Sequence, residues 1–321
     1  MKKIAILTSG GDASTMNKCL STFVTYASEY DCEIYFVCNG YKGLYNNEFY
    51  KANFTVTKSW WDLPGTKIYS SRFPEIKEEN VRNQMLENLK NNNIDCLVVI
   101  GGDGSYNGAK LLSKYGINVI CLPGTIDNDV TSTTYSIGFD TCLNTVVDAI
   151  KKIKSCMNSL GTVGMVEIMG RHCIDLTVFA GIATESDIII TPSSHFTPEQ
   201  LLEKIKEKRR TNKKGIMILY VENYLGTGDI PSVDEYIKYI HTNSKEKVKK
   251  NVLGYLQRGG SPTAMDLVRA SLMTKEALEL IKANMFNRVI GVNEFQVVSY
   301  EIEEGLKMKN PNREKLIKNF F

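Results

Sequence analysis

Short apolar runs and helical patterns alternate along the whole chain, and few folds satisfy such an alternation. The runs expected to form strands are residues 3–8, 33–38, 97–100, 118–122, 163–168, 188–191, 216–221, 252–256 and 289–292. The stretches expected to form helices are residues 14–28, 78–91, 106–114, 141–157, 176–184, 197–209, 233–241 and 265–283. Strands that alternate with helices of this length indicate β-α-β units, whose strands run parallel with right-handed crossovers. The pattern therefore predicts an α/β protein with parallel sheets.

The length of the chain favours more than one domain. Its 321 residues exceed the usual size of a single domain. The sequence contains no internal repeat, low-complexity segment or long linker, so we expect the boundary at a crossing of the chain near residues 136–140. One helix start is indicated by Thr197-Pro198-Glu199-Gln200, with a threonine cap, a proline at the first helical position and a glutamine at the third.

Charge and cysteine content disfavour several classes of function. The 39 basic and 36 acidic residues leave a net charge of +3, too small to favour nucleic acid or a membrane as the main partner. The eight cysteines form no C-x-x-C pair and the three histidines have no metal-ligand spacing, which disfavours zinc. The apolar stretch after Met1-Lys2-Lys3 is too short for a signal-peptide core, and no run reaches the roughly 18 residues that span a bilayer. We therefore expect a soluble, cytoplasmic protein with reduced thiols.

Two glycine-rich segments follow apolar runs, where buried strands should end. Gly101-Gly102-Asp103-Gly104-Ser105 allows a tight turn whose backbone amides face phosphate while the carboxylate faces a metal ion. Mg²⁺ is commonly held by one or two carboxylates together with substrate phosphates. The segment is neither a Walker A loop nor a dinucleotide fingerprint. Residues 8–14 form a similar strand–helix turn, which is equally compatible with a nucleotide site and with a plain connection.

The segment 123–129 places Thr125, Asp127 and Asp129 at the end of another predicted strand. In open parallel α/β sheets, ligands bind outside the carboxyl ends of the strands. Phosphoryl transfer needs positioning, charge neutralisation and a base for the attacking hydroxyl. One aspartate can take the proton while the other organises the metal and phosphate. The alternative is that the paired aspartates only cap the turn.

Further candidates for binding an anionic substrate follow other predicted strands. Arg171 ends the segment Met169-Gly170-Arg171, where it can bind phosphate through two hydrogen bonds. Arg72 and Arg258 also lie in turns, and Glu222 follows a strand directly, where it can accept a hydrogen bond from a sugar hydroxyl. An ion pair or an ordinary strand-end glutamate is the alternative in these places. A serine or cysteine triad is disfavoured because no G-x-S-x-G elbow accompanies the histidines.

Taken in order, these segments resemble the ATP-dependent 6-phosphofructokinases of the bacterial type. The resemblance covers nearly the whole chain and rests on L-T-S-G-G-D-A at 7–13, S-R-F-P-E at 71–75, V-V-I-G-G-D-G-S-Y at 98–106, P-G-T-I-D-N-D at 123–129, V-E-I-M-G-R-H at 166–172 and Q-R-G-G-S-P at 257–262. It implies two Rossmann-like, three-layer α/β domains with mainly parallel sheets. Residues 1–138 plus about 252–300 would form a larger ATP-binding domain, and residues 139–251 plus about 301–321 a smaller sugar-phosphate-binding domain.

The resemblance also implies an activity and its partners. The implied reaction is phosphorylation of fructose 6-phosphate at its 1-hydroxyl by Mg-ATP, which gives fructose 1,6-bisphosphate in glycolysis. Mg²⁺ is the implied cofactor, and the implied assembly is a homotetramer with shared active sites. Glycines at 104 and 124 resemble the ATP-using branch of the family, since pyrophosphate-using relatives place bulkier charged groups there.

The roles of individual residues are carried over position by position. Asp127 resembles the base for the sugar hydroxyl, and Asp103 the Mg²⁺ ligand. The residues expected to stabilise the moving phosphoryl group are Thr125, Arg171 and the amide of Gly11, and Asp129 is expected to support the metal and phosphate environment. Those expected to line the ATP site are Gly11, Arg72, Phe73, Gly102, Asp103, Gly104 and Ser105. Those expected to bind the sugar phosphate are Thr125, Ile126, Asp127, Met169, Gly170, Arg171, Glu222, Lys249, Tyr255 and Arg258.

The chain departs from the family pattern at the pocket for the sugar's 6-phosphate. Two family arginines and a histidine align with Thr162, Lys249 and Tyr255. Lysine keeps the charge but loses the two-pronged hydrogen bonding of arginine. Each charge-assisted hydrogen bond contributes about 1.5–3 kcal/mol, so we expect weaker binding of the phosphorylated sugar. The residues expected to transfer the phosphoryl group are intact.

The effector site also departs from the pattern. Ser21, Thr25 and Thr211 stand where relatives use arginines for a nucleoside diphosphate or phosphoenolpyruvate. Residues compatible with an effector remain at Lys154, Asp187 and Lys213. We therefore expect weak or absent control by these ligands. Two other functions stay open: a kinase of the same fold with a different sugar acceptor, and a weakly active regulatory subunit of a hetero-oligomer.

Overall fold

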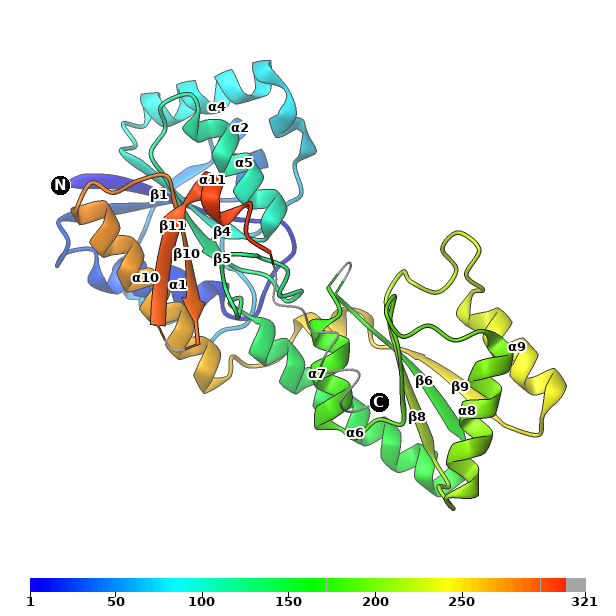
Figure 1. The fold of residues 1–321 in the computed structure, drawn as a ribbon. Coiled ribbons are helices and arrows are strands. Elements are labelled where there is room, and N and C mark those ends of the chain that lie inside the picture. Colours follow the sequence, from blue (N-terminus) through cyan, green and yellow to red (C-terminus); the bar gives the residue numbers. More distant parts are fainter. Residues whose placement is uncertain (171–172, 295, 310–321) are drawn as a thin grey trace. The chain divides into compact units, whose positions relative to one another are not determined.

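The computed structural model describes residues 1–170, 173–294 and 296–309, and it divides into two compact units (Figure 1). Unit 1 contains Met1–Cys142 and the chain that resumes at Arg258. Unit 2 contains Leu143–Gln257. Each unit is built on its own sheet, and the predicted α/β fold with mainly parallel strands is confirmed.

Unit 1 is organised around a seven-stranded sheet of order β11-β10-β5-β4-β1-β2-β3. The strands are β1 (Lys2–Ser9), β2 (Cys32–Val37), β3 (Phe49–Lys51), β4 (Cys96–Gly101), β5 (Val119–Pro123), β10 (Arg288–Asn293) and β11 (Gln296–Glu301). The two edge strands, β3 and β11, pair antiparallel and the others pair parallel. In this register Ser9 lies opposite Gly101, and Gly101 lies opposite Pro123. The carboxyl ends of β1, β4 and β5 therefore finish side by side.

Helices cover both faces of this sheet. On one face, α2 (Gly40–Tyr45), α4 (Glu79–Asn91) and α5 (Asp103–Ser113) pack on alternate strand residues such as Ala5 and Leu7. On the other, α1 (Met16–Tyr26) and α10 (Ala264–Lys282) lie side by side (Figure 1). The remaining short elements are α3 (Phe54–Lys58), α11 (Ile302–Gly305) and the 3₁₀ helix η1 (Pro74–Lys77). Because both faces are covered, β4 and β5 are apolar throughout, and all their residues are buried.

Unit 2 has a four-stranded parallel sheet of order β7-β8-β6-β9. Its strands are β6 (Val163–Ile168), β7 (Ile188–Ile190), β8 (Ile216–Val221) and β9 (Val248–Val252). One face packs against α8 (Pro198–Arg210) and α9 (Val233–Asn243), and α7 (Asp175–Ala183) contacts β7 and β8. The long helix α6 (Phe139–Leu160) begins in unit 1 and continues in unit 2. The predicted capping box of Thr197 and Gln200 is present and begins α8.

One predicted strand is wrong. Residues 252–256 do not form a strand: β9 ends at Val252, and Gly254–Arg258 forms the 3₁₀ helix η2. The true strand has the sequence V-K-K-N-V and lies at the sheet edge with Lys249 and Lys250 exposed. Charged residues are usual on an edge strand, where they discourage pairing with other chains, so no apolar run indicates it.

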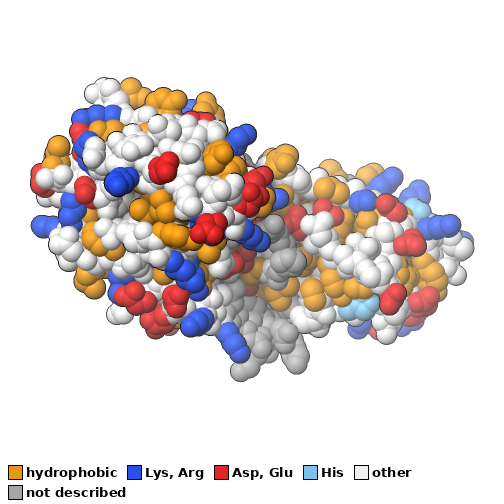
Figure 2. Space-filling view, turned by 90° about the horizontal axis from the view of Figure 1, so that it is seen from above, with side chains coloured by type: hydrophobic (Ala, Val, Ile, Leu, Met, Phe, Trp, Pro, Cys, Tyr) orange, Lys and Arg blue, Asp and Glu red, His pale blue; other side chains and the backbone are white. Residues whose placement is uncertain are grey.

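The charged side chains on the surface agree with the small net charge of the sequence. On the face drawn in Figure 2, acidic and basic side chains are interspersed, without a broad field of one sign. Within the described residues, no helix combines the length and the apolar character needed to cross a membrane.

Candidate functional site

Three strand ends of unit 1 bring the predicted loops together. The turn 10–12 follows β1, the segment 101–105 ends β4, and the segment 123–129 ends β5. A Cβ placed on Gly102 would lie 3.6 Å from the Cβ of Thr125, and one on Gly10 would lie 3.6 Å from the Oγ of Ser105. An added Cβ would thus just reach the neighbouring loop, so the three loops lie side by side with a narrow space above their glycines.

The segment 101–105 is the start of a helix rather than a free loop. Helix α5 begins at Asp103, after an extended Gly102. The Oγ of Ser105 donates to the carbonyl of Ser9 at 3.1 Å, and the hydroxyl of Tyr41 donates to the carbonyl of Ser105 at 2.6 Å. A Cβ on Gly101 would lie 2.5 Å from the Ser9 carbonyl oxygen, so only glycine fits. The result is a firmly held helix N-terminus, which favours anions such as phosphate.

Asp103 is the carboxylate that this helix start exposes. Its carboxylate accepts a hydrogen bond from the Nδ2 of Asn107 at 3.1 Å, which fixes its direction. A Cβ on Gly104 would meet nothing within 4 Å, so there is room beside the carboxylate. The described residues contain no group of three or more His, Cys, Asp or Glu side chains able to hold a metal ion. One carboxylate with phosphate and water oxygens suits Mg²⁺, and the residues fit that cation.

The loop after β5 holds Asp127 in a braced and nearly buried position. Asp127 is 8% exposed, and its backbone N–H donates to the Oγ1 of Thr125 at 3.2 Å. The Oγ of Ser136 donates to the carbonyl of Thr125 at 2.7 Å, and the backbone N–H of Ser136 donates to the Oδ1 of Asn128 at 2.8 Å. Asn128 has a φ of 54°, in the left-handed region that asparagine tolerates. These bonds fix the backbone on which Asp127 stands. The neighbouring side chain of Ile126 lies in the core with 1% exposure, so only its backbone can face a ligand.

Arg258 lies over the glycine turn that follows β1. Its Nη1 donates to the backbone carbonyl of Asp12 at 3.3 Å and lies 3.4 Å from the Asp12 carboxylate. A Cβ on Gly11 would be 3.1 Å from the guanidinium carbon and closer still to Nη1. The guanidinium therefore occupies the space above Gly11 that only glycine leaves open.

The segment with Arg72 and Phe73 is tied to the same turn. The backbone N–H of Gly10 donates to the carbonyl of Ser71 at 3.2 Å, and the Oγ of Ser70 donates to the carbonyl of Gly10 at 2.9 Å. Arg72 is exposed, and the ring of Phe73 lies 5.8 Å from the ring of Tyr45. Ser70 and Ser71 thus hold the chain that leads into Arg72 and Phe73 next to the turn 10–12.

Unit 2 gathers a second set of predicted residues at the carboxyl ends of β6 and β8. The backbone N–H of Gly170 donates to the Oε1 of Glu222 at 3.2 Å, and that of Met169 donates to the Oε1 of Gln257 at 3.0 Å. Gly170 has a φ of 143° and its position allows no Cβ, since one would lie too close to the Cys173 carbonyl. Arg171, predicted to bind the transferring group and the sugar phosphate, lies outside the described residues.

The residues that depart from the family pattern lie elsewhere in unit 2. Thr162 precedes β6, is 4% exposed and has its Oγ1 2.9 Å from the Sδ of Met157. Lys249 pairs with Gly164 near the same amino end of β6. Met169 follows the opposite end of that strand, about 20 Å away at the rise of a β-strand. Tyr255 is 83% exposed in η2. The structure therefore does not bring Thr162 and Lys249 of one chain to the Met169–Gly170 cluster.

The candidate effector residues of unit 2 are engaged with the chain itself. The Nζ of Lys154 donates to the carbonyl of Thr184 at 2.6 Å, at the C-terminus of α7. Asp187 accepts the backbone N–H of Met217 at 2.9 Å and forms an ion pair with Lys213. In unit 1, Ser21 and Thr25, which stand where relatives use arginines, donate their hydroxyls to the backbone carbonyls of Lys58 and Ser21.

Sequence reasoning missed several supporting residues. Tyr41, Asn128 and Ser136 brace the two loops, and Asp12 receives Arg258. No local pattern marks Tyr41, because its partner lies 64 positions away in the chain. Asn128 could have been recognised as a residue that tolerates a positive φ within a tight turn.

The sheet sets a glycine-rich helix start beside a loop that carries aspartates. This arrangement is typical of enzymes that transfer a phosphoryl group. The family is identified by a match of residues 3–281 to the family described as Phosphofructokinase, and the chain belongs to that family.

Similar proteins agree with this assignment. A protein of Malacoplasma penetrans named "Probable ATP-dependent 6-phosphofructokinase" is 72% identical over 321 residues and 100% of both chains. The "ATP-dependent 6-phosphofructokinase" of Photobacterium profundum is 42% identical over 98% of this chain and 97% of its own.

Among solved structures, phosphofructokinase from Saccharomyces cerevisiae superposes with a TM-score of 0.89 at 26% identity, covering 100% of this chain and 50% of that chain. This chain therefore spans half the length of the yeast protein. A pyrophosphate-dependent phosphofructokinase from Marinobacter aquaeolei has the same fold, with a TM-score of 0.86 at 19% identity over 98% of this chain and 86% of its own.

Proposed function

We propose that this protein is an ATP-dependent 6-phosphofructokinase that phosphorylates fructose 6-phosphate at its 1-hydroxyl and gives fructose 1,6-bisphosphate. Membership of the family and the names of relatives at 72% and 42% identity support this activity. The observation that supports the mechanism is the closeness of the two segments: the backbone N–H of Gly124 donates to the carbonyl of Gly101 at 3.1 Å, and a Cβ built on Gly102 would lie 3.6 Å from the Cβ of Thr125. It sets the cradle for the donor phosphates beside the loop that holds the base.

The donor side of the reaction is assigned to unit 1. The ATP phosphates would lie at the N-terminus of α5, among the amides of Gly102, Gly104 and Ser105, with Gly11 opposite. Arg72 and Phe73 would flank the nucleotide. Mg²⁺ would be held by Asp103 and the phosphates, and it supplies neutralisation of their charge.

The proton is assigned to Asp127. In this proposal the carboxylate of Asp127 takes the proton of the sugar's 1-hydroxyl as the hydroxyl oxygen forms a bond to the γ-phosphorus of ATP. The bond from that phosphorus to the β,γ-bridging oxygen breaks, and ADP leaves with the bridging oxygen. A base in a fixed position typically contributes about 10²–10⁴-fold in rate. Thr125, Arg171 and the amide of Gly11 would stabilise the transferring group, and Asp129 would support the metal and phosphate.

The residues for the sugar phosphate follow from the family resemblance. We propose that Ile126 binds through its backbone, and that Met169, Gly170 and Glu222 bind the sugar while Arg258 binds its phosphate. Because Thr162 and Lys249 lie at the amino end of β6, any contact of theirs with this ligand would come from another copy of the chain. We therefore propose a homotetramer in which active sites are shared, with Lys249 and Tyr255 at the 6-phosphate.

A second candidate function is a kinase of the same fold with another acceptor. It is favoured by the burial of Thr162, which replaces a family arginine with a side chain that faces Met157. The test is ADP release by the purified homomeric protein with a panel of sugars and sugar phosphates, with and without a magnesium chelator. The main proposal predicts fructose 6-phosphate as the best acceptor and no turnover after chelation. A different best acceptor would contradict it, and turnover by the homomer would exclude a purely regulatory subunit.

A further inference from the structure

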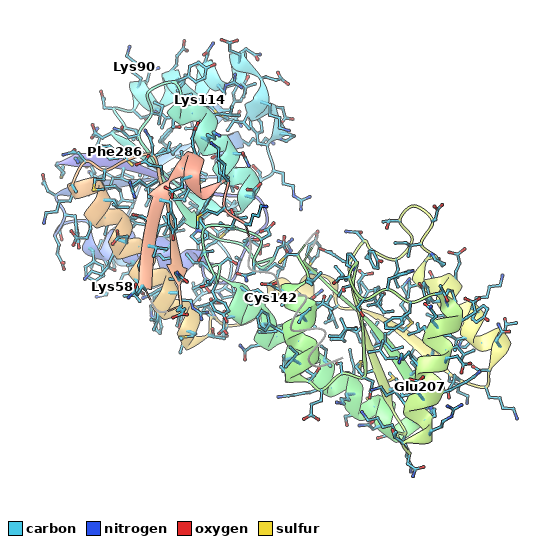
Figure 3. All side chains as sticks on the ribbon, in the orientation of Figure 1. Lys58, Lys90, Lys114, Cys142, Glu207 and Phe286 are labelled. Atoms are coloured by element: carbon cyan, nitrogen blue, oxygen red, sulfur yellow. The ribbon has the colours of Figure 1, made fainter. Side chains whose placement is uncertain are left out.

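Two helix N-termini meet in unit 1 and are joined by side-chain hydrogen bonds, while Thr263 also caps its own helix α10 by accepting the backbone N–H of Asp266 at 3.3 Å. Asp266 lies in the first turn of α10 and Thr141 in the first turn of α6. The Oδ2 of Asp266 accepts two hydrogen bonds from Thr141, one from its backbone N–H at 2.8 Å and one from its hydroxyl at 2.6 Å. In return, the backbone N–H of Thr263 donates to the Oγ1 of Thr141 at 3.1 Å, and its hydroxyl donates to the Oδ2 of Asp140 at 2.6 Å. We name these four residues the cross-cap. Cys142, labelled in Figure 3, follows Thr141 directly.

The central residues of the cross-cap are buried. Asp266 and Thr141 are 0% and 1% exposed, so their hydrogen bonds do not compete with water. The positive ends of two helix dipoles face the buried carboxylate, which favours its charged form. Burial acts in the opposite direction and raises the pKa of Asp266, while the hydrogen bonds from Thr141 lower it. The bonds from Thr141 to this carboxylate hold the beginning of α6 next to the beginning of α10.

One arm of the cross-cap leads to the loop of Asp127. Helix α6 follows Gly138, which has a φ of 98° and packs so closely on Ala13 that a Cβ would lie 2.6 Å from that residue's Cβ. Two residues earlier, Ser136 bonds to both Thr125 and Asn128. Fixing the start of α6 therefore fixes the end of the 123–137 segment.

The other arm leads to Arg258. Thr263 is joined to Arg258 by only four intervening residues, and the Oγ of Ser14 donates to the carbonyl of Arg258 at 3.0 Å. The guanidinium then reaches Asp12. The helix start at Asp103 is held by other bonds, those of Ser105 to Ser9 and of Tyr41 to Ser105.

We infer that the cross-cap is a positioning device for phosphoryl transfer, in which Asp266 and Thr263 set the places of Asp127 and Arg258 relative to each other. This inference rests on the proposed function for its catalytic meaning. Neither residue is assigned a contact with substrate. They act on the acceptor half of the reaction and leave the nucleotide half unchanged.

The kinetic test uses a matched pair of variants. Thr263→Val removes the hydroxyl that donates to Asp140 and caps α10, and it keeps the shape of the side chain, whereas Thr263→Ser keeps the hydroxyl and both bonds. A displacement near 1 Å is expected to lower kcat/KM for fructose 6-phosphate by roughly tenfold or more in Thr263→Val, with the KM for ATP changed by less than about twofold. Thr263→Ser should behave as the parent. Thr274→Val, a buried hydroxyl deletion further along α10, is the control for helix packing and should also behave as the parent.

A second measurement needs no turnover. Hydrogen exchange of the protein without substrates should be faster in Thr263→Val at residues 123–137 and 258–262, and unchanged at residues 96–113. Asp266→Asn, which removes the charge between the two helix ends, should give the same pattern. Equal exchange in Thr263→Val and Thr263→Ser, or faster exchange spread evenly over unit 1, would overturn the inference. An inactive parent enzyme would count against the proposed function alone, because the exchange pattern still decides this inference.

Discussion

Replacement of Gly11 by alanine tests whether Arg258 is held at the phosphate-binding turn. The added Cβ would lie 3.1 Å from the guanidinium carbon of Arg258 and closer to Nη1. The tip of a flexible side chain yields more readily than backbone, so we expect the guanidinium to move by about 1 Å. Its bonds to Asp12, already 3.3 and 3.4 Å long, would then be lost.

The magnitude follows from the charge-assisted hydrogen bonds that Arg258 is proposed to make. Loss of one such bond costs about 1.5–3 kcal/mol, which corresponds to a fall of roughly 10- to 150-fold in kcat/KM for fructose 6-phosphate. The assay is initial-rate kinetics with fructose 6-phosphate varied at saturating ATP and Mg²⁺. The melting temperature serves as the check that the variant is folded.

A double-mutant cycle separates this cause from any other. In the Arg258→Ala background the clash is absent, so Gly11→Ala should then cost little further activity. Effects of residues in contact are expected to be non-additive in this way. If Gly11→Ala reduced kcat/KM by the same factor in both backgrounds, the reasoning through Arg258 would be refuted.

Three further predictions concern other parts of the chain. Gly104→Asp should leave the melting temperature unchanged, because a Cβ at this position meets nothing within 4 Å. The variant should bind ATP more weakly, since it adds negative charge beside the proposed place of the phosphates. Unchanged affinity in a binding titration would contradict that placement of ATP. ADP or phosphoenolpyruvate should change the half-saturating concentration of fructose 6-phosphate by less than about twofold, because Lys154 and Lys213 already bond within the chain. A larger change would contradict the expected lack of control by these ligands. A thiol reagent near neutral pH should modify the exposed Cys156 well before the buried Cys19, because burial raises the pKa of the Cys19 thiol to about 12. Mass spectrometry would contradict this expectation if it found Cys19 modified first.

The fold was predictable where local pattern and tertiary environment agree. Strands β4, β6 and β8 are buried on both faces and appear as apolar runs in the sequence. Strand β9 was missed because an edge position lets lysines replace apolar residues. The short strand β3 was missed because three residues are too few to establish a period of two.

The site was predictable where chemistry follows a strand end directly. Asp103 and Asp127 could be located because glycine and proline mark the turns in which they lie. The two aspartates lie near each other because β4 and β5 are neighbours in the sheet. The order of strands in a sheet does not follow from the local sequence pattern. The cross-cap was not predictable, since Thr141 and Asp266 are 125 positions apart and each resembles an ordinary residue of a helix start.

The most direct test of the account is the rate of phosphoryl transfer by Asp127→Ser, measured together with ATP binding. Asp127 stands nearly buried on a braced loop, and the proposal makes it the group that takes the proton of the sugar hydroxyl. We expect kcat to fall by about 10²–10⁴-fold while the dissociation constant for ATP stays near the parent value. Turnover close to that of the parent, or a loss of ATP binding of similar size, would contradict the assignment of the base.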